Sequence, residues 1–223
     1  AAVRSVLDQT FRDLELIVID DGSPDGTAAV VKGFSDPRLN YRHQSNQDAY
    51  NALTRGLGLA RGTFVAILNS DDLYRPERLA RLCAEADGSG AQAIFTDVAP
   101  IDAAGNPIPA GAHYWHIWHQ RNRAFYRECG DLFTAFLKGN FMVTTSNLFM
   151  TAAAAKTVGD FAPLRYLHDY DYIFRLMLAF PGRVRYLQDE QLLSYRIHGA
   201  NTLSQGARVA RVRVPGREGG LRG

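Results

Sequence analysis

Apolar residues along the chain gather in short runs that end in acidic residues. Residues 63–68, Thr-Phe-Val-Ala-Ile-Leu, are followed at 69–72 by Asn-Ser-Asp-Asp. Such a run of β-branched and aromatic residues without strict alternation predicts a strand buried on both faces, as in a parallel sheet covered by helices. A second, largely apolar run at 14–19 ends in the acidic pair at 20–21. We therefore expect carboxylates at the carboxyl ends of two strands, where open α/β sheets bind their ligands.

The rest of the chain alternates between helical and strand-like patterns. Helices are expected over residues 1–10, 28–34, 46–60, 76–86, 132–137, 152–158 and 170–180. Further strands are expected over residues 39–43, 91–98, 141–150, 184–187 and 191–197. This alternation predicts an α/β fold with a mostly parallel sheet between helical layers.

Residues 113–127 break this pattern. The segment is crowded with aromatic, histidine and arginine residues, and no single period dominates. His113, His116 and His119 recur at every third position, which suggests a metal site, but a helical zinc site uses i, i+4 spacing. Long irregular segments in compact domains are often lids or binding loops. A mobile loop over the cleft is therefore the preferred interpretation.

Composition narrows the range of partners. The net charge is +2, but the stretch from Arg208 holds five arginines and one glutamate, so the remainder is slightly acidic. No stripe of basic residues with interleaved aromatics occurs elsewhere, and no nucleic-acid partner is expected. Cys83 and Cys129 lie far apart, as expected of free thiols in a reduced compartment. Because the sequence has neither a long apolar window nor a leader pattern, we expect a cytoplasmic protein or one peripheral to the inner face of the membrane.

The acidic pairs suit metal-assisted chemistry. Two acids beside a crevice can hold a hard divalent cation, which in turn can hold a diphosphate. Asp71 is the residue that we expect to ligate such an ion, because it ends the strand predicted over 63–72. The alternative is that Asp71 and Asp72 cap the helix expected at 76–86.

Several separated stretches, taken in order, resemble the family-2 nucleotide-sugar glycosyltransferases, which are inverting enzymes of the GT-A fold. The stretches are 6–11 with 16–23, 46–62, 68–72, 159–161 with 168–175, and 195–198 with Asn201 and Ser204. The resemblance implies a Rossmann-like GT-A domain at 1–204, with a nucleotide-sugar-binding half at 1–98 and an acceptor-side half at 99–204. The family's first strand would precede residue 1, so the sheet is expected to lack it. The Arg/Gly-rich tail at 205–223 has too few apolar residues to fold alone, and we expect it to be disordered.

The resemblance also assigns roles to individual residues. Asp71 matches the metal motif and His198 the closing segment, so both are expected to bind Mg²⁺ or Mn²⁺; His198 could instead contact the diphosphate or be a structural histidine. Asp169 matches the acidic motif as general base, with a helix N-cap as its alternative role and Asp171 as its rival. The residues expected to bind the donor are Asp20, Asp21, Ser23, Asn46, Arg55, Asn69 and Ser70.

The implied function is metal-dependent transfer of a hexose-type sugar from a UDP- or dTDP-type donor to a glycan or lipid-linked acceptor, in surface polysaccharide or glycolipid synthesis. Asn69 stands where the family usually has Asp, so one carboxylate would have to hold the ion. His168 stands where the family usually has Glu. A non-catalytic sugar-nucleotide or glycan-binding module is the alternative. A sugar nucleotidyltransferase would need a Gly-rich phosphate loop with a basic residue, and the sequence has none.

Overall fold

The computed structural model describes residues 1–198. The tail predicted at 205–223, together with Asn201 and Ser204, lies outside the described residues. The helices are α1 (Ala2–Leu7), α2 (Thr27–Lys32), α3 (Ala49–Leu59), α4 (Arg78–Ser89), α5 (Tyr114–Cys129), α6 (Leu132–Lys138), the 3₁₀ turn η1 (Thr145–Asn147), α7 (Ala152–Val158) and α8 (His168–Ala179). The strands are β1 (Leu16–Asp21), β2 (Leu39–Gln44), β3 (Phe64–Ala66), β4 (Leu73–Tyr74), β5 (Ala93–Ile101), β6 (Phe149–Thr151) and β7 (Val184–Arg196).

Within the described range the strands form two sheets. β1 and β2 pair in parallel, from Leu16 opposite Leu39 to Asp21 opposite Gln44. The other sheet has the order β3-β6-β5-β7-β4. β5 and β7, its longest strands, pair in parallel, whereas the short strands β3, β4 and β6 join antiparallel. The sheet is therefore rich in parallel pairing, as predicted, and no strand pairing among the described residues joins β1 to the larger sheet.

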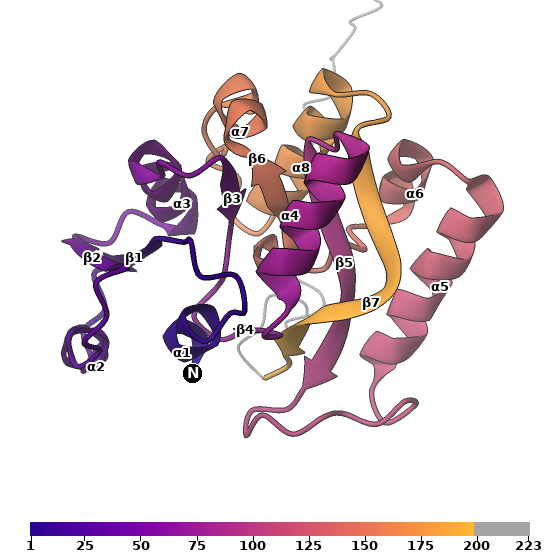
Figure 1. The fold of residues 1–223 in the computed structure, drawn as a ribbon. Helices are drawn as coiled ribbons and strands as arrows, with labels where there is room; N and C mark the ends of the chain where they lie inside the picture. The colour runs from indigo at the N-terminus through magenta and orange to yellow at the C-terminus, as the bar shows by residue number, and fades with distance from the viewer. Residues whose placement is uncertain (199–223) are drawn as a thin grey trace, which may run out of the picture.

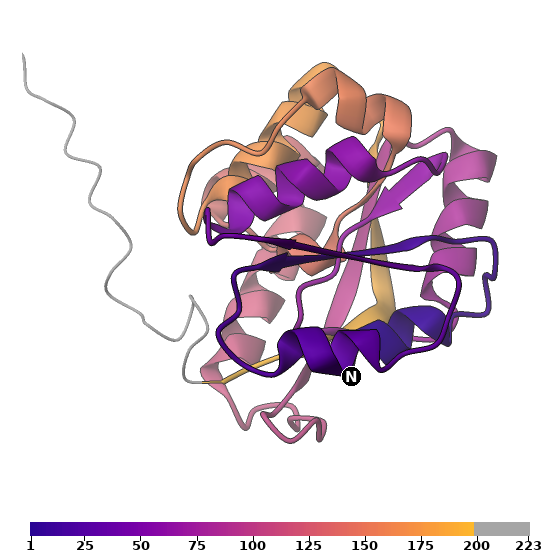
Figure 2. The same cartoon turned by 90° about the vertical axis from the view of Figure 1, so that its left-hand side faces the viewer.

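Helices cover both sheets. In Figure 1 the β1–β2 pair lies to one side with α2 and α3, and α5 and α6 lie beyond β5 and β7 on the other side. Figure 2 shows the β1–β2 pair between α3 and α2. The main core packs α6 and α8 against β5 and β7. There Phe95 stacks on Tyr186 at a centroid distance of 4.8 Å and meets Phe136 and Phe141 edge-on. Phe136 also meets Phe174 of α8 edge-on, at a centroid distance of 6.1 Å, so this core holds the helix whose first turn carries Asp169.

The strand predicted over 63–72 is much shorter than expected. β3 spans three residues, pairs only with β6, and is half-buried or exposed along its length. The ladder stops because the backbone amide of Asn69 donates to the hydroxyl of Ser146, at 2.9 Å, in place of a strand carbonyl. The prediction of a strand buried on both faces is wrong here, and β5 is the strand that is buried along nearly all of its length at the centre of the larger sheet.

The strand predicted over 141–150 is also mostly absent, and only its end enters β6. Val143 has a φ of +79°, which no strand accommodates. The Asn147 side chain binds both backbone groups of Thr96, at 3.1 Å to its amide and 2.7 Å to its carbonyl, and so replaces ladder bonds. The two strands predicted at 184–187 and 191–197 are one strand, β7, whose register against β5 shifts at Asp97.

The segment predicted as a mobile loop is the helix α5. Its buried residues, Trp115, His119 and Asn122, follow the i, i+4, i+7 spacing of one helix face, but two of the three are polar, so no apolar period marks the helix in the sequence. His113 is its N-cap, with Nδ1 accepting from the amide of Trp115 at 3.1 Å. His116 contacts the carbonyl of Ile108, and the Trp115 ring stacks on His119 and meets His116 edge-on. The described residues contain no group of three or more potential metal ligands.

Candidate functional site

The two aspartates that end β1 face different surroundings. Asp20 is 4% exposed; it accepts from the Tyr41 hydroxyl and from the amide of Ser23 at 2.9 Å. The Tyr41 hydroxyl bond, followed by the Ser23 bond, holds the pKa of Asp20 far below its usual range. Asp21 is only half-buried. The Asp20 carboxylate is therefore bound by other groups of the protein, and Asp21 is the more accessible of the two aspartates.

Asp21 lies in a chain of hydrogen bonds that reaches Arg55. Gln44 Nε2 donates to Asp21 Oδ1 at 2.7 Å, and Arg55 donates to Gln44 Oε1 at 2.8 Å. The amide of Gln47 also donates to Asp21, at 2.9 Å. Gln44 was not predicted from the sequence; its position directly opposite Asp21 in the β1–β2 register is the signal that identifies it.

Close approach of two backbones brings the predicted residue Asn46 beside this chain. Gly22 has a φ of +77°, and a Cβ at this position would lie 2.7 Å from the amide nitrogen of Asn46. Only glycine fits both the backbone angle and the space. Asn46 and Ser23 are both exposed, as is Arg55. The structure thus gathers five of the seven predicted donor residues around the carboxyl end of β1: Asp20, Asp21, Ser23, Asn46 and Arg55.

Asp71 and Asp72 are adjacent in sequence but differ in role. Asp71 is 35% exposed at its side chain, and its Oδ2 lies 3.1 Å from Nε2 of His198. Asp72 is 1% exposed and accepts from Ser146 Oγ at 2.6 Å and from the amide of Arg196 at 3.0 Å. The alternative in which this pair caps the next helix is wrong, because α4 begins at Arg78 with Glu77 as its N-cap.

A buried turn at 140–147 contacts residues from both halves of the chain. Thr144 and Ser146 hold Asp72, and they also bind Asn69, whose amide nitrogen Nδ2 donates to Thr144 Oγ1 at 3.1 Å. Asn69 is therefore committed to this turn, and Ser70 beside it is exposed. Sequence reasoning missed the turn because its apolar residues suggested a strand. The one available signal was the unbroken polar run at 144–147, Thr-Thr-Ser-Asn.

The same turn reaches Asp169. Asn140 Nδ2 donates to Asp169 Oδ2 at 3.2 Å, and Thr145 Oγ1 lies 3.4 Å from Nε2 of His168. Asp169 is 9% exposed, and burial raises its pKa. Its alternative role as N-cap is wrong, since α8 begins at His168 and Leu167 is the N-cap.

Asp171, the predicted rival of Asp169, lies in the first turn of α8, as expected. Its carboxylate forms an ion pair with Arg175 at 2.7 Å, and Arg175 Nε donates to the same oxygen at 2.8 Å. This i, i+4 pairing is a common stabilising contact on a helix. Asp171 is thus engaged by its own helix, whereas Asp169 is held by the turn at 140–147.

Comparison with known proteins identifies the family. The family model described as glycosyl transferase family 2 matches residues 1–147. The chain belongs to this family. An uncharacterized glycosyltransferase of Nostoc sp. is 29% identical over 206 residues, covering 90% of this chain and 61% of the relative. The succinoglycan biosynthesis protein ExoO of Rhizobium meliloti is 36% identical over 108 residues, covering 48% of this chain and 31% of that protein.

A solved structure shows the same fold. The crystal structure of S. aureus TarS in complex with UDP-GlcNAc superposes with a TM-score of 0.66 at 19% sequence identity, covering 92% of this chain and 56% of that chain. The chain thus has the GT-A fold and spans less than two thirds of the length of these relatives. Among residues 1–198, no helix has the length and apolar character needed to cross a membrane.

Family membership implies a divalent cation, and Asp71 with His198 fits one. A carboxylate oxygen and an imidazole nitrogen that already lie 3.1 Å apart, both partly exposed, can turn toward one ion. Mg²⁺ is typically bound through one or two carboxylates plus substrate phosphates, so few protein ligands are needed. Asp72 and Asn69 are committed to the buried turn and cannot add to this set without breaking it. Asp71 and His198 are the residues that would hold the ion, which would neutralise charge on a departing diphosphate.

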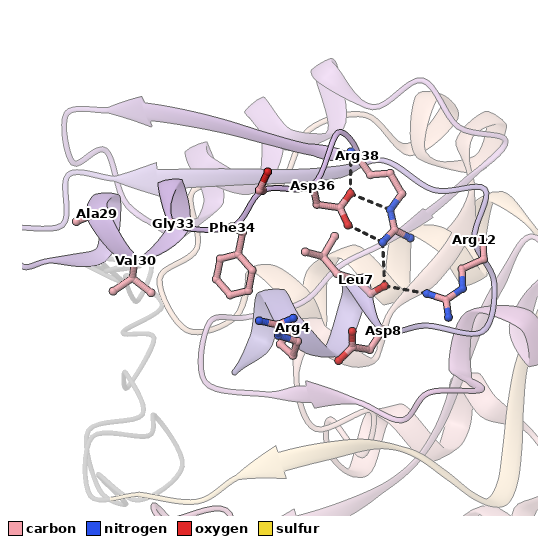
Figure 3. Close-up of a pocket in the computed structure, with 11 residues that line it drawn as sticks. Arg4, Leu7, Asp8, Arg12, Ala29, Val30, Gly33, Phe34, Asp36 and Arg38 are labelled. Carbon is pink, nitrogen blue, oxygen red and sulfur yellow. Dashed lines mark hydrogen bonds and ion pairs between the residues drawn. The ribbon is translucent and has the colours of Figure 1, made fainter.

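A pocket of about 440 Å³ between α1 and α2 lies apart from these residues. In Figure 3 two of its three arginines, Arg38 and Arg12, donate to the carbonyl of Leu7, the last residue of α1, at 2.9 and 3.3 Å. Arg38 also forms an ion pair with Asp36 at 2.7 Å. These contacts hold the end of α1 against the start of β2, and the pocket contains none of the predicted site residues.

Proposed function

We propose that the chain is the catalytic part of an inverting glycosyltransferase that moves a sugar from a UDP- or dTDP-type donor to an acceptor hydroxyl. The observation that carries the proposal is the buried turn at 140–147, which holds carboxylates from both halves of the chain. It binds Asp72, next to the metal-side Asp71, and it binds Asp169 at the start of α8. One element thus fixes the donor side relative to the acceptor side.

The donor is expected to bind at the carboxyl end of β1. Asp21 can accept hydrogen bonds from a nucleobase imide or from ribose hydroxyls, and Arg55 can donate to a phosphate or a sugar hydroxyl. Gln44 joins the two side chains and keeps both oriented. A uridine-type donor is supported by the likeness in fold to TarS, which was solved with UDP-GlcNAc.

Asp169 is proposed as the general base. In a direct displacement the acceptor oxygen bonds to the anomeric carbon as the bond from that carbon to the diphosphate oxygen breaks, and the hydroxyl proton passes to the base. Burial raises the pKa of Asp169, which makes the carboxylate a better proton acceptor. Asp171 is less suited, because its carboxylate is paired with Arg175.

The acceptor is proposed to be a glycan or a lipid-linked glycan in polysaccharide or glycolipid synthesis, with the protein acting at the inner face of the membrane. Relatives support this class: ExoO belongs to succinoglycan biosynthesis, and the chondroitin synthase of Escherichia coli is 32% identical over 139 residues, covering 60% of this chain and 20% of that protein.

Release of nucleoside diphosphate from a panel of UDP- and dTDP-sugars, with and without Mn²⁺, tests the proposal. Water serves as the acceptor, so the natural acceptor need not be known. We expect release from at least one donor, and only with the metal. Donor binding without release would indicate a non-catalytic sugar-nucleotide-binding module. In a parallel assay with a nucleoside triphosphate and a sugar 1-phosphate, pyrophosphate release with formation of a nucleotide-sugar would indicate a nucleotidyltransferase. Either result would overturn the proposal.

A further inference from the structure

Asp169 is held at both carboxylate oxygens. The backbone amide of Tyr170 donates to Oδ1 at 2.8 Å, which is a contact within α8 itself. The side-chain amide of Asn140 donates to Oδ2 at 3.2 Å from a different part of the chain. Asn140 is the contact that ties the carboxylate to the rest of the site, because the turn that it begins also binds Asp72.

The backbone around Asn140 is firmly held. The amide of Val143 donates to the carbonyl of Asn140 at 3.1 Å, and Phe141 and Met142 between them are buried. Val143 has a φ of +79°, an angle that costs a β-branched residue energy and persists only where the surroundings enforce it. The side chain of Asn140 therefore projects from a backbone with little freedom to move.

We propose that Asn140 is a positioning residue that keeps the Asp169 carboxylate oriented and ionised, so that it can take the proton of the acceptor hydroxyl. The inference rests on the proposed function, in which Asp169 takes the acceptor proton. An amide suits this task, because it donates a hydrogen bond without bringing a charge. A lysine or arginine here would favour the ionised form so strongly that the carboxylate would become a poor proton acceptor.

Asp169 sits in a balance of opposing effects. Burial raises its pKa, and the charge of His168, the Tyr170 amide and the Asn140 amide act in the opposite direction. His168 is the titratable group whose charge acts on Asp169; its ring contacts neutral Thr145 of η1 and packs edge-on against Phe161. Loss of the Asn140 donor should therefore raise the pKa of Asp169 further.

The direct test is a ¹³C NMR titration of the aspartate carboxyls, with the Asp169 signal assigned from an Asp169→Asn variant. In Asn140→Ala the pKa of Asp169 should rise by about one to two units, the size expected when a hydrogen bond to a charged group is lost. Asn140→Asp, which keeps the shape of the side chain, should raise it at least as far through like charge. The isosteric variant keeps the test valid if the alanine variant does not fold.

Asn122→Ala is the matched control. Asn122 is buried and its Oδ1 lies 3.5 Å from where a Cβ on Gly139 would be, so it packs beside the same turn, but its amide donates to Trp118 and not to Asp169. This variant should destabilise the fold and leave the pKa of Asp169 unchanged. An unchanged pKa in the Asn140 variants, or an equal rise in Asn122→Ala, would overturn the inference.

Activity provides the second readout. The acidic limb of kcat/KM for nucleoside diphosphate release should move upward in pH with the NMR pKa, while the Kd for UDP stays at the wild-type value. If the wild-type protein releases no nucleoside diphosphate from any donor, the proposed function fails, and the titration still decides whether Asn140 controls Asp169. If release is normal and the limb does not move in Asn140→Ala, the inference alone fails.

Discussion

The imidazole Nε2 of His198 lies 3.1 Å from Oδ2 of Asp71, a contact that joins two positions 127 residues apart. Both side chains are partly exposed. The pair brings the end of β7 against the loop that follows β3. Next to it, Asp72 points the other way, into the buried turn at 140–147. The neighbouring aspartates thus have different surroundings: Asp71 is partly exposed beside His198, and Asp72 is bound within the fold.

Asp71→Ala should weaken Mn²⁺-dependent UDP binding by about 10-fold or more. This is the loss of affinity expected when a residue that binds or supports a metal ion is removed. Thermal stability should hardly change, because the side chain is partly exposed. Isothermal calorimetry with and without Mn²⁺ measures the effect. His198→Ala should show the same pattern, and the double variant should lose little more than either single one. Full additivity of the two losses would contradict a shared ion.

Asp72→Ala should lower the free energy of unfolding. It removes the acceptor for Ser146, Thr144 and the Arg196 amide in a buried site, which should cost about 1–3 kcal/mol. For a chain of this size that corresponds to a fall in Tm of about 2–10 °C. Asp72→Asn keeps an acceptor and should cost less. A variant with normal Tm but weakened UDP binding would place Asp72, and not Asp71, in the ligand site.

Gln44→Ala should weaken UDP binding, because Gln44 links Asp21 to Arg55. Without it, Asp21 and Arg55 lose their common partner, and UDP affinity should fall by about 5- to 10-fold, as for one or two hydrogen bonds. Gln92→Ala is the control, since Gln92 accepts from Thr151 at 2.8 Å in the other sheet. Equal effects of the two substitutions on UDP binding would show that the donor side is organised differently.

Stability should depend on pH through His119. Burial, helped by the charge of Arg123, lowers the pKa of His119 to about 4. An unfolded chain binds the same proton near pH 6.5, so between these values only the unfolded state is protonated. The contribution to the free energy of unfolding is complete above about pH 6.5 and is lost as the pH falls toward 4.

Urea unfolding of the wild type and His119→Gln at several pH values measures this contribution. The stability difference between them should shrink by up to about 3 kcal/mol from pH 7 to pH 4. Nearby Asp97 has a pKa raised by burial and changes stability in the opposite sense, which the comparison of variants largely cancels. A difference that stays constant with pH would show that His119 titrates normally.

The sequence predicted the elements in which backbone groups bond to other backbone groups, because their apolar residues then follow a regular period. β1, β2 and β5 and most helices lie within a few residues of their predicted positions. The predictions failed at 63–72 and 141–150, where side chains replace backbone ladder bonds. Ser146 takes the Asn69 amide, and Asn147 takes both backbone groups of Thr96. Hydrogen bonds of this kind compete with strands and leave no periodic signal.

Part of the candidate site stands out in the sequence. The acidic pairs at 20–21 and 71–72 and the motif around Asp169 can be recognised there, although only the first pair ends a strand. The partners that give each carboxylate its role do not stand out: Ser146 and Asn140 lie far from Asp72 and Asp169 along the chain, and their contacts depend on the tertiary fold. Asp71 and Asp72 differ in burial because they face opposite sides of the loop. Two identical residue types next to each other give no sign of this in the sequence.

The most direct measurement is the turnover of Asp169→Asn beside Asp171→Asn, followed as nucleoside diphosphate release from the best donor. Asn still accepts the Tyr170 amide but cannot take a proton, so turnover should fall by about 10²–10⁴ while Tm and UDP affinity stay near wild type. Asp171→Asn breaks the ion pair with Arg175 and should retain turnover. Near-normal turnover in Asp169→Asn, with the loss in Asp171→Asn instead, would contradict the account.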